Sequence, residues 1–414
     1  MIVLLILITI HILHRKWQRY WLARQHQCQP PFHLPTRDPL LGLDHLLWTQ
    51  RAARSRTFLV QNEQRFARYG HTHQQRQLLT PIHEPTGPLL GQGILTTDGG
   101  SWSHTRALLR PTFAKTQIPD LSIFDSLMDD LLALIPTDGR PVDLQKLFFC
   151  YSIDSATEYL SGRCIHTLRK LQSPGAEHGE DAHVAGAFNH AQAAMQTRMR
   201  LGILRVFHRD ARAKESIRAC HRFVGEVIDD ALGKVEEDNE ILAERDRPVS
   251  LYQETIIEQT TDRTRLCDEL LHILLAMKYL RYCLHESLRL HPPMPIITRF
   301  ANRDTVLPVG GGLRGLDPVL VIKGTMAIGD IYAMHRRGEI FGTDALGFRP
   351  ERWEDLRPES ICLGQHFALT EAGYVTVCLA QKFSVLERRD CRPWQENLTM
   401  TLSSNNGTWV SLRE

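Results

Sequence analysis

The sequence predicts a mainly α-helical protein with a small β-sheet. Apolar residues recur at three- and four-residue spacing in four stretches: 121–135, 212–232, 251–260 and 265–291. Residues 303–328 are instead rich in glycine and β-branched residues, which is typical of strands joined by turns. A last helix is expected from near Leu363 towards Phe383. With 414 residues, the chain can bury a large core.

Composition and charge favour an ordinary globular protein. Lys and Arg number 49 and Asp and Glu 47, a net charge of +2 that gives no support for a nucleic-acid partner. The nine cysteines are scattered without a C-x-x-C pair, so neither a disulfide framework nor a zinc ribbon is indicated.

Residues 1–21 are expected to form an N-terminal membrane anchor. The first thirteen residues are almost wholly apolar, and Arg15, Lys16 and Arg19 follow with Trp17 and Trp21 between and after them. Thirteen helical residues reach about 20 Å, less than the roughly 30 Å of a bilayer core, and a start site further upstream would explain the shortfall. The flanking charges predict a single pass with the following domain on the cytoplasmic side. A cleaved signal peptide is the alternative, which the missing cleavage site disfavours.

Residues 22–40 are expected to form a proline-rich strap, because prolines at 30, 31, 35 and 39 block regular structure. Residues 41–414 then form a single domain. This division predicts a stiff, extended link between the anchor and the body.

Cys362 is a candidate metal ligand. It stands just before a predicted helix, where free backbone N–H groups favour the thiolate form that binds metals. Gly364 allows a flat ligand to approach the backbone, and the small Ala368 lies on the same face of the helix. A buried structural cysteine would show the same spacing.

Glu286 and Arg289 stand three residues apart on one predicted helix and can form an ion pair. A surface pair of this kind is common and contributes little. Here the apolar residues before Glu286 would bury it, and a buried pair needs further partners. Arg352 is the candidate third member.

Trp102 and Arg106 stand four residues apart on another predicted helix. An indole N–H and a guanidinium at that spacing can both hold a carboxylate. A tryptophan packed in the core beside a solvated arginine is the alternative. Arg299 is a further cation just after a turn.

Together and in this order, these segments resemble the cytochrome P-450 superfamily. The matching motifs are W-x-x-x-R at 102–106, E-x-x-R at 286–289, P-E-R at 350–352 and C-x-G-x-x-x-A at 362–368. Several stretches, among them 37–43, 99–111, 303–312 and 332–337, are similar to the fungal subgroup that hydroxylates n-alkanes and fatty acids.

The resemblance implies a haem-thiolate monooxygenase of the endoplasmic reticulum membrane that acts on a long-chain apolar substrate. Its cofactor would be haem b, with electrons from NADPH through a flavin-containing reductase, and its further partner membrane lipid. It implies that Cys362 is the proximal ligand beside Gly364 and Ala368. Trp102, Arg106 and Arg299 would hold the propionates, and Glu286, Arg289 and Arg352 would form a structural triad.

The sequence also departs from the family. The family's ligand loop has the pattern F-x-x-G-x-R-x-C. This chain has Asp355, Pro358 and Ser360 in place of its phenylalanine, glycine and arginine, and proline has no N–H to donate to the sulfur. After Ala276, the acid and threonine segment that relays protons to dioxygen is absent. Chain is also missing between Thr80 and Gly91. We therefore expect an incomplete P-450 fold without a retained catalytic proton relay.

Two other functions remain open on the sequence alone. The first is a catalytically impaired haem-binding relative, or the product of an incomplete gene model. The second is a membrane-tethered helical interaction protein without a cofactor. Haem content separates the second from the other readings, and NADPH-driven oxidation separates an enzyme from an impaired relative.

Overall fold

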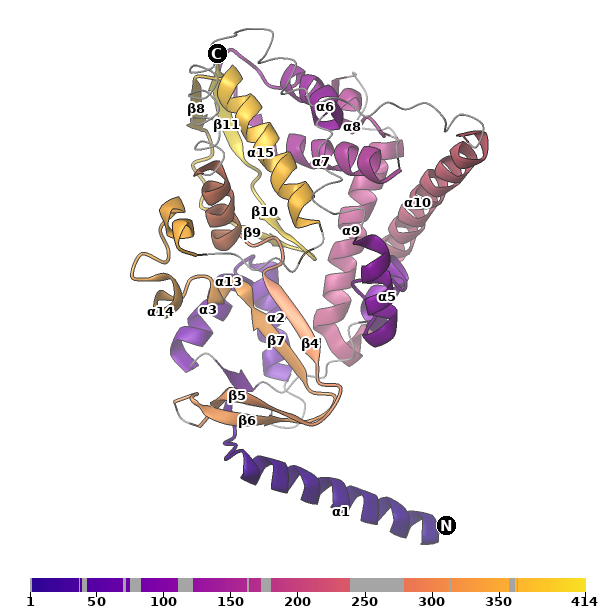
Figure 1. Ribbon diagram of the computed structural model, residues 1–414, viewed down its shortest axis with the longest axis vertical. Coiled ribbons are helices and arrows are strands. Elements are labelled where there is room, and N and C mark those ends of the chain that lie inside the picture. Colours follow the sequence, from indigo (N-terminus) through magenta and orange to yellow (C-terminus); the bar gives the residue numbers. More distant parts are fainter. Residues whose placement is uncertain are drawn as a thin grey trace, which may run out of the picture.

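Helices form most of the computed structural model, and the strands among the described residues pair into five small sheets (Figure 1). The structure describes residues 2–36, 38, 43–69, 72–74, 83–110, 122–161, 164–172, 180–238, 279–312, 314–356, 362 and 364–414. The predicted fold class is confirmed: the described part of the chain is mainly helical, and its β-structure is divided among small sheets of two or three strands.

The helices of the first part of the chain are α1 (Ile2–Gln25), α2 (Leu43–Arg54), α3 (Phe58–Tyr69), α4 (His83–Leu90), α5 (Gly99–Leu109), α6 (Ser122–Ala133), α7 (Leu144–Ser161), α8 (Thr167–Gln172), α9 (Glu180–Leu201), the 3-10 helix η3 (Gly202–Phe207) and α10 (Ala211–Asp238). Those of the second part are a helix over 279–290, α13 (Ile331–Met334), α14 (Gly338–Phe341), the 3-10 helix η4 (Pro350–Glu354) and α15 (Gln365–Lys382). The predicted helices at 121–135, 212–232 and 363–383 are confirmed. The one at 251–260 lies outside the described residues.

The strands are β1 (Phe32–His33), β2 (His73–Gln74), β3 (Val142–Asp143), β4 (Ile296–Phe300), β5 (Thr305–Gly311), β6 (Asp317–Val321), β7 (Met326–Asp330), β8 (Val385–Arg388), β9 (Glu396–Leu398), β10 (Leu402–Ser404) and β11 (Trp409–Arg413). Strands β3, β11 and β8 form the three-stranded sheet, and β4–β7 and β5–β6 are antiparallel pairs. The predicted strands over 303–328 are therefore confirmed. Gly310 and Gly312 have φ of 120° and 71°, which explains the glycines at this irregular turn.

The N-terminal segment differs from its predicted division. α1 continues to Gln25, past the expected boundary at residue 21, because the first helix-breaking residue of the strap is Pro30. The strap contains β1, which pairs in parallel with β2, and Gln29 donates its backbone N–H to the Pro318 carbonyl at 2.8 Å. Within the described part of the chain, none of the helices has the length and hydropathy needed to span a bilayer. The physical reason is that the apolar run of α1 gives way to charge at Arg15.

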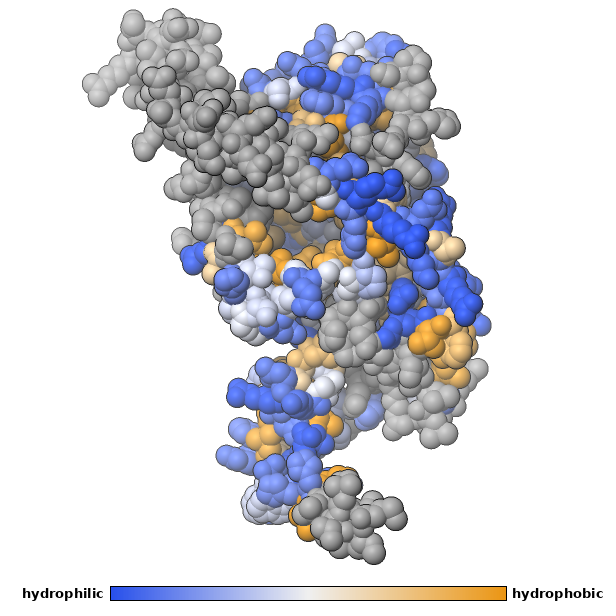
Figure 2. Space-filling view, turned by 90° about the vertical axis from the view of Figure 1, so that its right-hand side faces the viewer, coloured by the Kyte–Doolittle hydropathy of each residue, from blue (hydrophilic) through white to orange (hydrophobic). Residues whose placement is uncertain are grey.

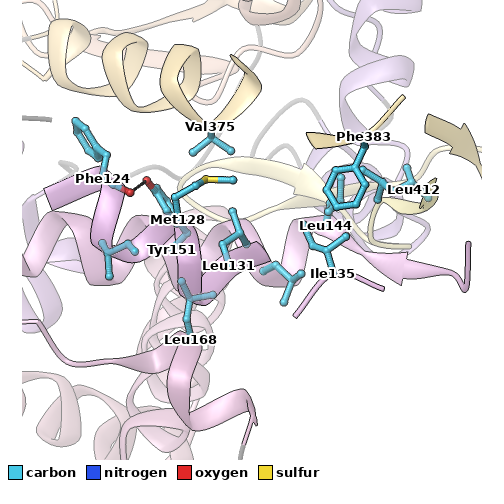
Figure 3. Close-up of a cluster of buried hydrophobic side chains, with 13 residues drawn as sticks. Phe124, Met128, Leu131, Ile135, Leu144, Tyr151, Leu168, Val375, Phe383 and Leu412 are labelled. Carbon is cyan, nitrogen blue, oxygen red and sulfur yellow. Dashed lines mark hydrogen bonds between the residues drawn. The ribbon is translucent and has the colours of Figure 1, made fainter. Parts of the chain in front are cut away.

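A hydrophobic core between α6, α7, α8, α15 and β11 holds the C-terminal half of α15 in place (Figure 3). Leu131, Leu168 and Leu412 are fully or almost fully buried there, and the Tyr151 hydroxyl donates to the Phe124 carbonyl at 2.9 Å. α15 contributes Val375 to this cluster, and Phe383 follows directly after its end. The position of α15 therefore depends on a core built mainly from residues 122–172.

A buried carboxylate joins two of these core helices. Asp154 on α7 is fully buried and accepts the backbone N–H groups of Thr167 and Leu168 at 2.8 and 3.0 Å, as well as the Thr167 hydroxyl. These are the first two residues of α8, whose amides have no partner inside the helix. Asp154 thus caps α8 from another element.

We predict that Asp154→Ala lowers the free energy of unfolding by about 2 to 3 kcal/mol, because it leaves buried amides without an acceptor. Urea denaturation followed by circular dichroism measures the loss. Asp129→Asn, at an exposed position on α6, is the matched control and should change little. Equal stability of Asp154→Ala and the wild type would contradict this role.

Candidate functional site

Glu286 stands at the centre of a buried ion-pair network. It is fully buried, as Arg289 and Arg352 almost are, with exposed fractions of 1% and 6%. Arg289 donates to both Glu286 oxygens at 2.8 Å, and Arg352 Nε donates to Oε1 at 2.9 Å. The structure therefore brings together the three residues of the predicted triad, from a helix and from η4.

Two further donors complete the coordination of this carboxylate. The Trp353 indole donates to Oε2 at 3.0 Å, and the backbone N–H of Arg349 donates to Oε1 at 2.9 Å. Sequence reasoning missed both. The signal for Trp353 was its place directly after Arg352. The Arg349 donor is a backbone N–H, which almost any residue type supplies, so the sequence gives no signal for it.

The two guanidiniums are satisfied by backbone carbonyls. Arg289 donates to the carbonyls of His335, Ala345 and Gly347, and Arg352 to those of Phe341 and Asp344. All five carbonyls belong to residues 335–347, so the network holds this irregular segment against the helix over 279–290. A buried ion pair stabilises a fold only when its remaining hydrogen bonds are made in this way.

The pKa of Glu286 reflects this coordination. Burial alone would raise it, but the hydrogen bonds from Arg289, the Arg349 backbone and Arg352 outweigh burial and lower the pKa from its ordinary value of 4.5 to about 2. The carboxylate therefore stays charged over the whole physiological pH range.

Cys362 lies three residues before α15, and its thiol is exposed. The Gln365 N–H reaches the Cys362 carbonyl at 3.4 Å, and the Ala368 N–H donates to the Gly364 carbonyl at 3.0 Å. Gly364 has open space around it, since a methyl group in place of its hydrogen would meet no atom within 4 Å. Ala368 is exposed as well. Among the described residues, the thiol and Ala368 are thus exposed at the start of α15, and the space over Gly364 is open.

The proposed propionate ligands lie on two other elements. On α5, Trp102 is 39% exposed, and the Arg106 guanidinium lies over its ring at 5.4 Å. The predicted proximity of these two side chains therefore takes the form of a cation–π contact. Arg299 on β4 is exposed and donates to the Thr298 carbonyl at 2.9 Å.

The surroundings of Cys362 leave room for the proximal side of a haem. The end of α15 that follows Cys362 points towards the middle of the molecule (Figure 1). Figure 2 shows a hollow at mid-height whose edge carries apolar residues. An exposed thiol, open space over Gly364 and a small side chain at Ala368 would together accept a flat macrocycle.

Parts of the predicted site lie outside the described residues. These are Pro358 and Ser360 of the ligand loop and Ala276, after which the proton-relay segment was expected to be absent. Asp355, where the family has phenylalanine, is exposed at the end of η4. Within the described residues, no group of three or more His, Cys, Asp or Glu side chains could hold a metal ion. An iron held by one thiolate and a macrocycle does not require such a group.

Comparison with known proteins shows which family this arrangement belongs to. Residues 271–409 match the family model of cytochrome P-450. A cytochrome P-450 monooxygenase of Aspergillus japonicus is 35% identical over 93% of this chain and 84% of its own length. The chain belongs to the cytochrome P-450 family. Because its relatives are monooxygenases, the chain is assigned to a family of enzymes, and the cofactor of that family is haem.

Two further relatives support the assignment. A cytochrome P-450 monooxygenase of Fusarium heterosporum is 34% identical over 95% of this chain and 85% of its own length. Cytochrome P-450 52A5 of Candida maltosa is 34% identical over 73% of this chain and 70% of its own length. The resemblance to the cytochrome P-450 superfamily is thereby confirmed, with relatives among fungal members of the family.

The alignments also show that this chain lacks internal segments. The match to the Aspergillus protein extends over 475 positions, more than the 414 residues of the chain. The match to the Fusarium protein extends over 491. Since both cover nearly the whole chain, the surplus positions must be residues that the relatives have and this P-450 does not.

We predict that Glu286→Gln lowers the free energy of unfolding by about 3 to 5 kcal/mol, because the buried Arg289 loses its countercharge and Arg352 keeps only the ion pair to Asp344 at 3.4 Å. The depressed pKa adds a pH dependence with a definite sign. The stability contributed by Glu286 is fully present above pH 4.5 and is lost as the pH falls towards 2.

Thermal unfolding of the wild type and Glu286→Gln at several pH values tests this prediction. The gap between them should narrow as the pH falls below 4.5. Glu351→Gln is the matched control, since Glu351 is an exposed acid in the neighbouring η4. A gap that widens in acid would contradict the assigned role of Glu286.

Proposed function

We propose that this P-450 is a haem-thiolate monooxygenase that inserts one oxygen atom from O2 into a C–H bond of a long apolar substrate. The observation that carries the proposal is the exposed thiol of Cys362 at the start of α15, with Gly364 and Ala368 open beside it. Bound there, the haem b would supply the oxygen activation that no protein side chain provides. The chain's own task is to bind and orient it.

The residues divide this task among them. Cys362 would bind the iron as a thiolate. Trp102 and Arg106 on α5 and Arg299 on β4 would pair with the propionates through an indole N–H and two guanidiniums. Glu286, Arg289 and Arg352 hold the segment from α13 to η4, which leads directly into the ligand loop. In this proposal they are positioning residues on the proximal side.

The substrate class proposed is an n-alkane or a fatty acid. The support is the similarity of the stretches at 99–111, 303–312 and 332–337 to the hydroxylases of that subgroup, together with the relationship to the Candida maltosa protein. Electrons would come from NADPH through a flavin-containing cytochrome P-450 reductase, as the family resemblance implies.

A second candidate function rests on the missing internal segments. A chain shorter than its relatives, without the acid and threonine segment after Ala276, could bind haem and yet deliver protons to dioxygen poorly. Such a protein would release reduced oxygen species in place of hydroxylated product. Haem binding and coupled turnover are therefore separate questions for this P-450.

We predict that the full-length chain binds one haem and that its reduced carbon-monoxide complex shows the thiolate Soret band. Cys362→Ser should abolish that band, because a serine oxygen is a much weaker donor to iron. Cys391→Ser, at another exposed cysteine, is the matched control and should leave the band intact. A thiolate band in Cys362→Ser would refute the assignment of the ligand.

Coupling separates the two candidate functions. With NADPH, a P-450 reductase and dodecane or lauric acid, the monooxygenase should form hydroxylated product in proportion to the NADPH consumed. The impaired relative should instead convert most of that NADPH into hydrogen peroxide. Measuring both products in one reaction decides between them.

We further propose that α1 attaches the protein to the endoplasmic reticulum membrane, with the domain on the cytoplasmic side. Its exposed residues combine apolar, aromatic and basic side chains, as interfacial segments do: Ile10, Ile12, Leu13, Trp17, Tyr20 and Trp21, with Lys16 and Arg24. Arg19 is the exception, since it pairs with Asp304 at 2.8 Å beside the β5–β6 hairpin and fixes α1 to the body.

We predict that replacing Trp17 and Trp21 together by serine weakens binding to vesicles of phosphatidylcholine and phosphatidylserine by about tenfold or more, because the interface no longer buries two indole rings. Vesicle flotation of the full-length protein measures this loss. Trp394→Ser, an exposed tryptophan in the C-terminal part of the chain, should bind like the wild type. Unchanged flotation of the double variant would rule out α1 as the attachment.

A further inference from the structure

α15 presents one face to the core, and Glu371 stands in the middle of it. Phe367, Tyr374 and Cys378 lie on this face at helical spacing and pack against the cluster of α6, α7 and α8. Phe367 meets the Tyr159 ring at 4.6 Å and the Phe124 ring at 5.5 Å. A carboxyl group in such a row is unusual, because removing it from water costs free energy unless it is hydrogen-bonded.

Glu371 has its partners on α7. The hydroxyl of Ser155, which is fully buried, donates to Glu371 Oε1 at 2.5 Å. Burial raises the pKa of Glu371, and the hydrogen bonds from Ser155 and Ser152 lower it only in part. Tyr151 is the titratable neighbour on the same side of α7. The interaction is a buried polar link between α15 and α7.

The hydrogen bond between Ser155 and Glu371 is directional, whereas the apolar contacts around it are not. Apolar contacts are non-directional, so rings alone allow α15 to rotate or slide by small amounts. A short hydrogen bond fixes direction as well as distance. A second polar link, from the Tyr374 hydroxyl to Asp125 Oδ1 at 2.6 Å, lies one turn further from Cys362.

On the opposite side, α15 meets the helix over 279–290. A methyl group on Gly373 would lie 3.8 Å from Leu280 Cδ2, so the two helices are in close approach there. The helix that carries Glu286 thus limits α15 from one side, while α7 limits it from the other. Two core-facing side chains of α15 make the polar contacts described above, Glu371 and Tyr374. Of these two, Glu371 lies nearer to Cys362 in the sequence.

We propose that Glu371 is a positioning residue for the haem ligand: through Ser155 it fixes the first turns of α15, and with them Cys362, against α7. The inference rests on the proposed function in one respect, namely that Cys362 binds the haem iron. The link itself is independent of haem.

Hydrogen exchange on the haem-free, full-length protein tests the link. Loss of one ordinary hydrogen bond should speed exchange of the amides at the start of α15 about fivefold in Glu371→Leu and in Ser155→Ala. Glu371→Gln keeps an acceptor oxygen and should exchange like the wild type. Tyr374→Phe, which removes the more distant link, is the matched control and should leave the first turns unchanged. Ser155→Ala keeps the test decisive if Glu371→Leu does not fold.

The haem-loaded protein tests the consequence for the ligand. The fraction of the carbon-monoxide complex with the thiolate band should fall in Glu371→Leu and Ser155→Ala, and Glu371→Gln should restore it. Unchanged exchange and an unchanged band in both variants would overturn the proposal, as would an equal loss in Tyr374→Phe. If the wild type takes up no haem, the proposed function fails, and the exchange measurement still decides whether Glu371 fixes α15.

Discussion

The structure of the second half of this chain depends on one buried carboxylate. Glu286 has no access to water, so its charge must be met by protein donors, and five N–H groups from four residues meet it. The guanidiniums that supply three of them then need acceptors, which they find in backbone carbonyls of residues 335–347. A loop segment of little regular structure thereby acquires a fixed path.

The position of Cys362 follows from two supports of different kinds. On one side, the network of Glu286 fixes η4, which ends eight residues before the thiol. On the other, α15 packs on the core of α6, α7 and α8 and begins three residues after it. Cys362 is therefore flanked in the chain by packed structure on both sides, the Glu286 network before it and α15 after it. In the proposed function, these two flanking parts would hold the haem ligand in place.

Some of this could be predicted from the sequence, because it depends on local spacing. The three-residue interval between Glu286 and Arg289 fixes their proximity on a helix, and the apolar face of α15 is visible in its periodicity. The remaining partners of Glu286 depend on tertiary contacts between residues more than sixty positions apart, so only Arg352 was named, and Trp353 was not. Trp102 and Arg106 show the same limit, since spacing predicts that they meet but not that the guanidinium stacks on the ring.

The missing segments and the intact proximal scaffold are compatible for a physical reason. The described contacts on either side of Cys362 join residues 279–356 to one another and α15 to residues 122–172. Every donor and acceptor of these contacts is present in this chain, so the shortening has not removed them. The match to the family model extends over residues 271–409 and therefore includes the Glu286 network and α15 but not residues 122–172. Under the proposed function, a P-450 shortened in this way would keep the residues that bind haem and would lack the segment that delivers protons to dioxygen. Affinity for the cofactor and coupling of turnover can therefore change independently in this protein.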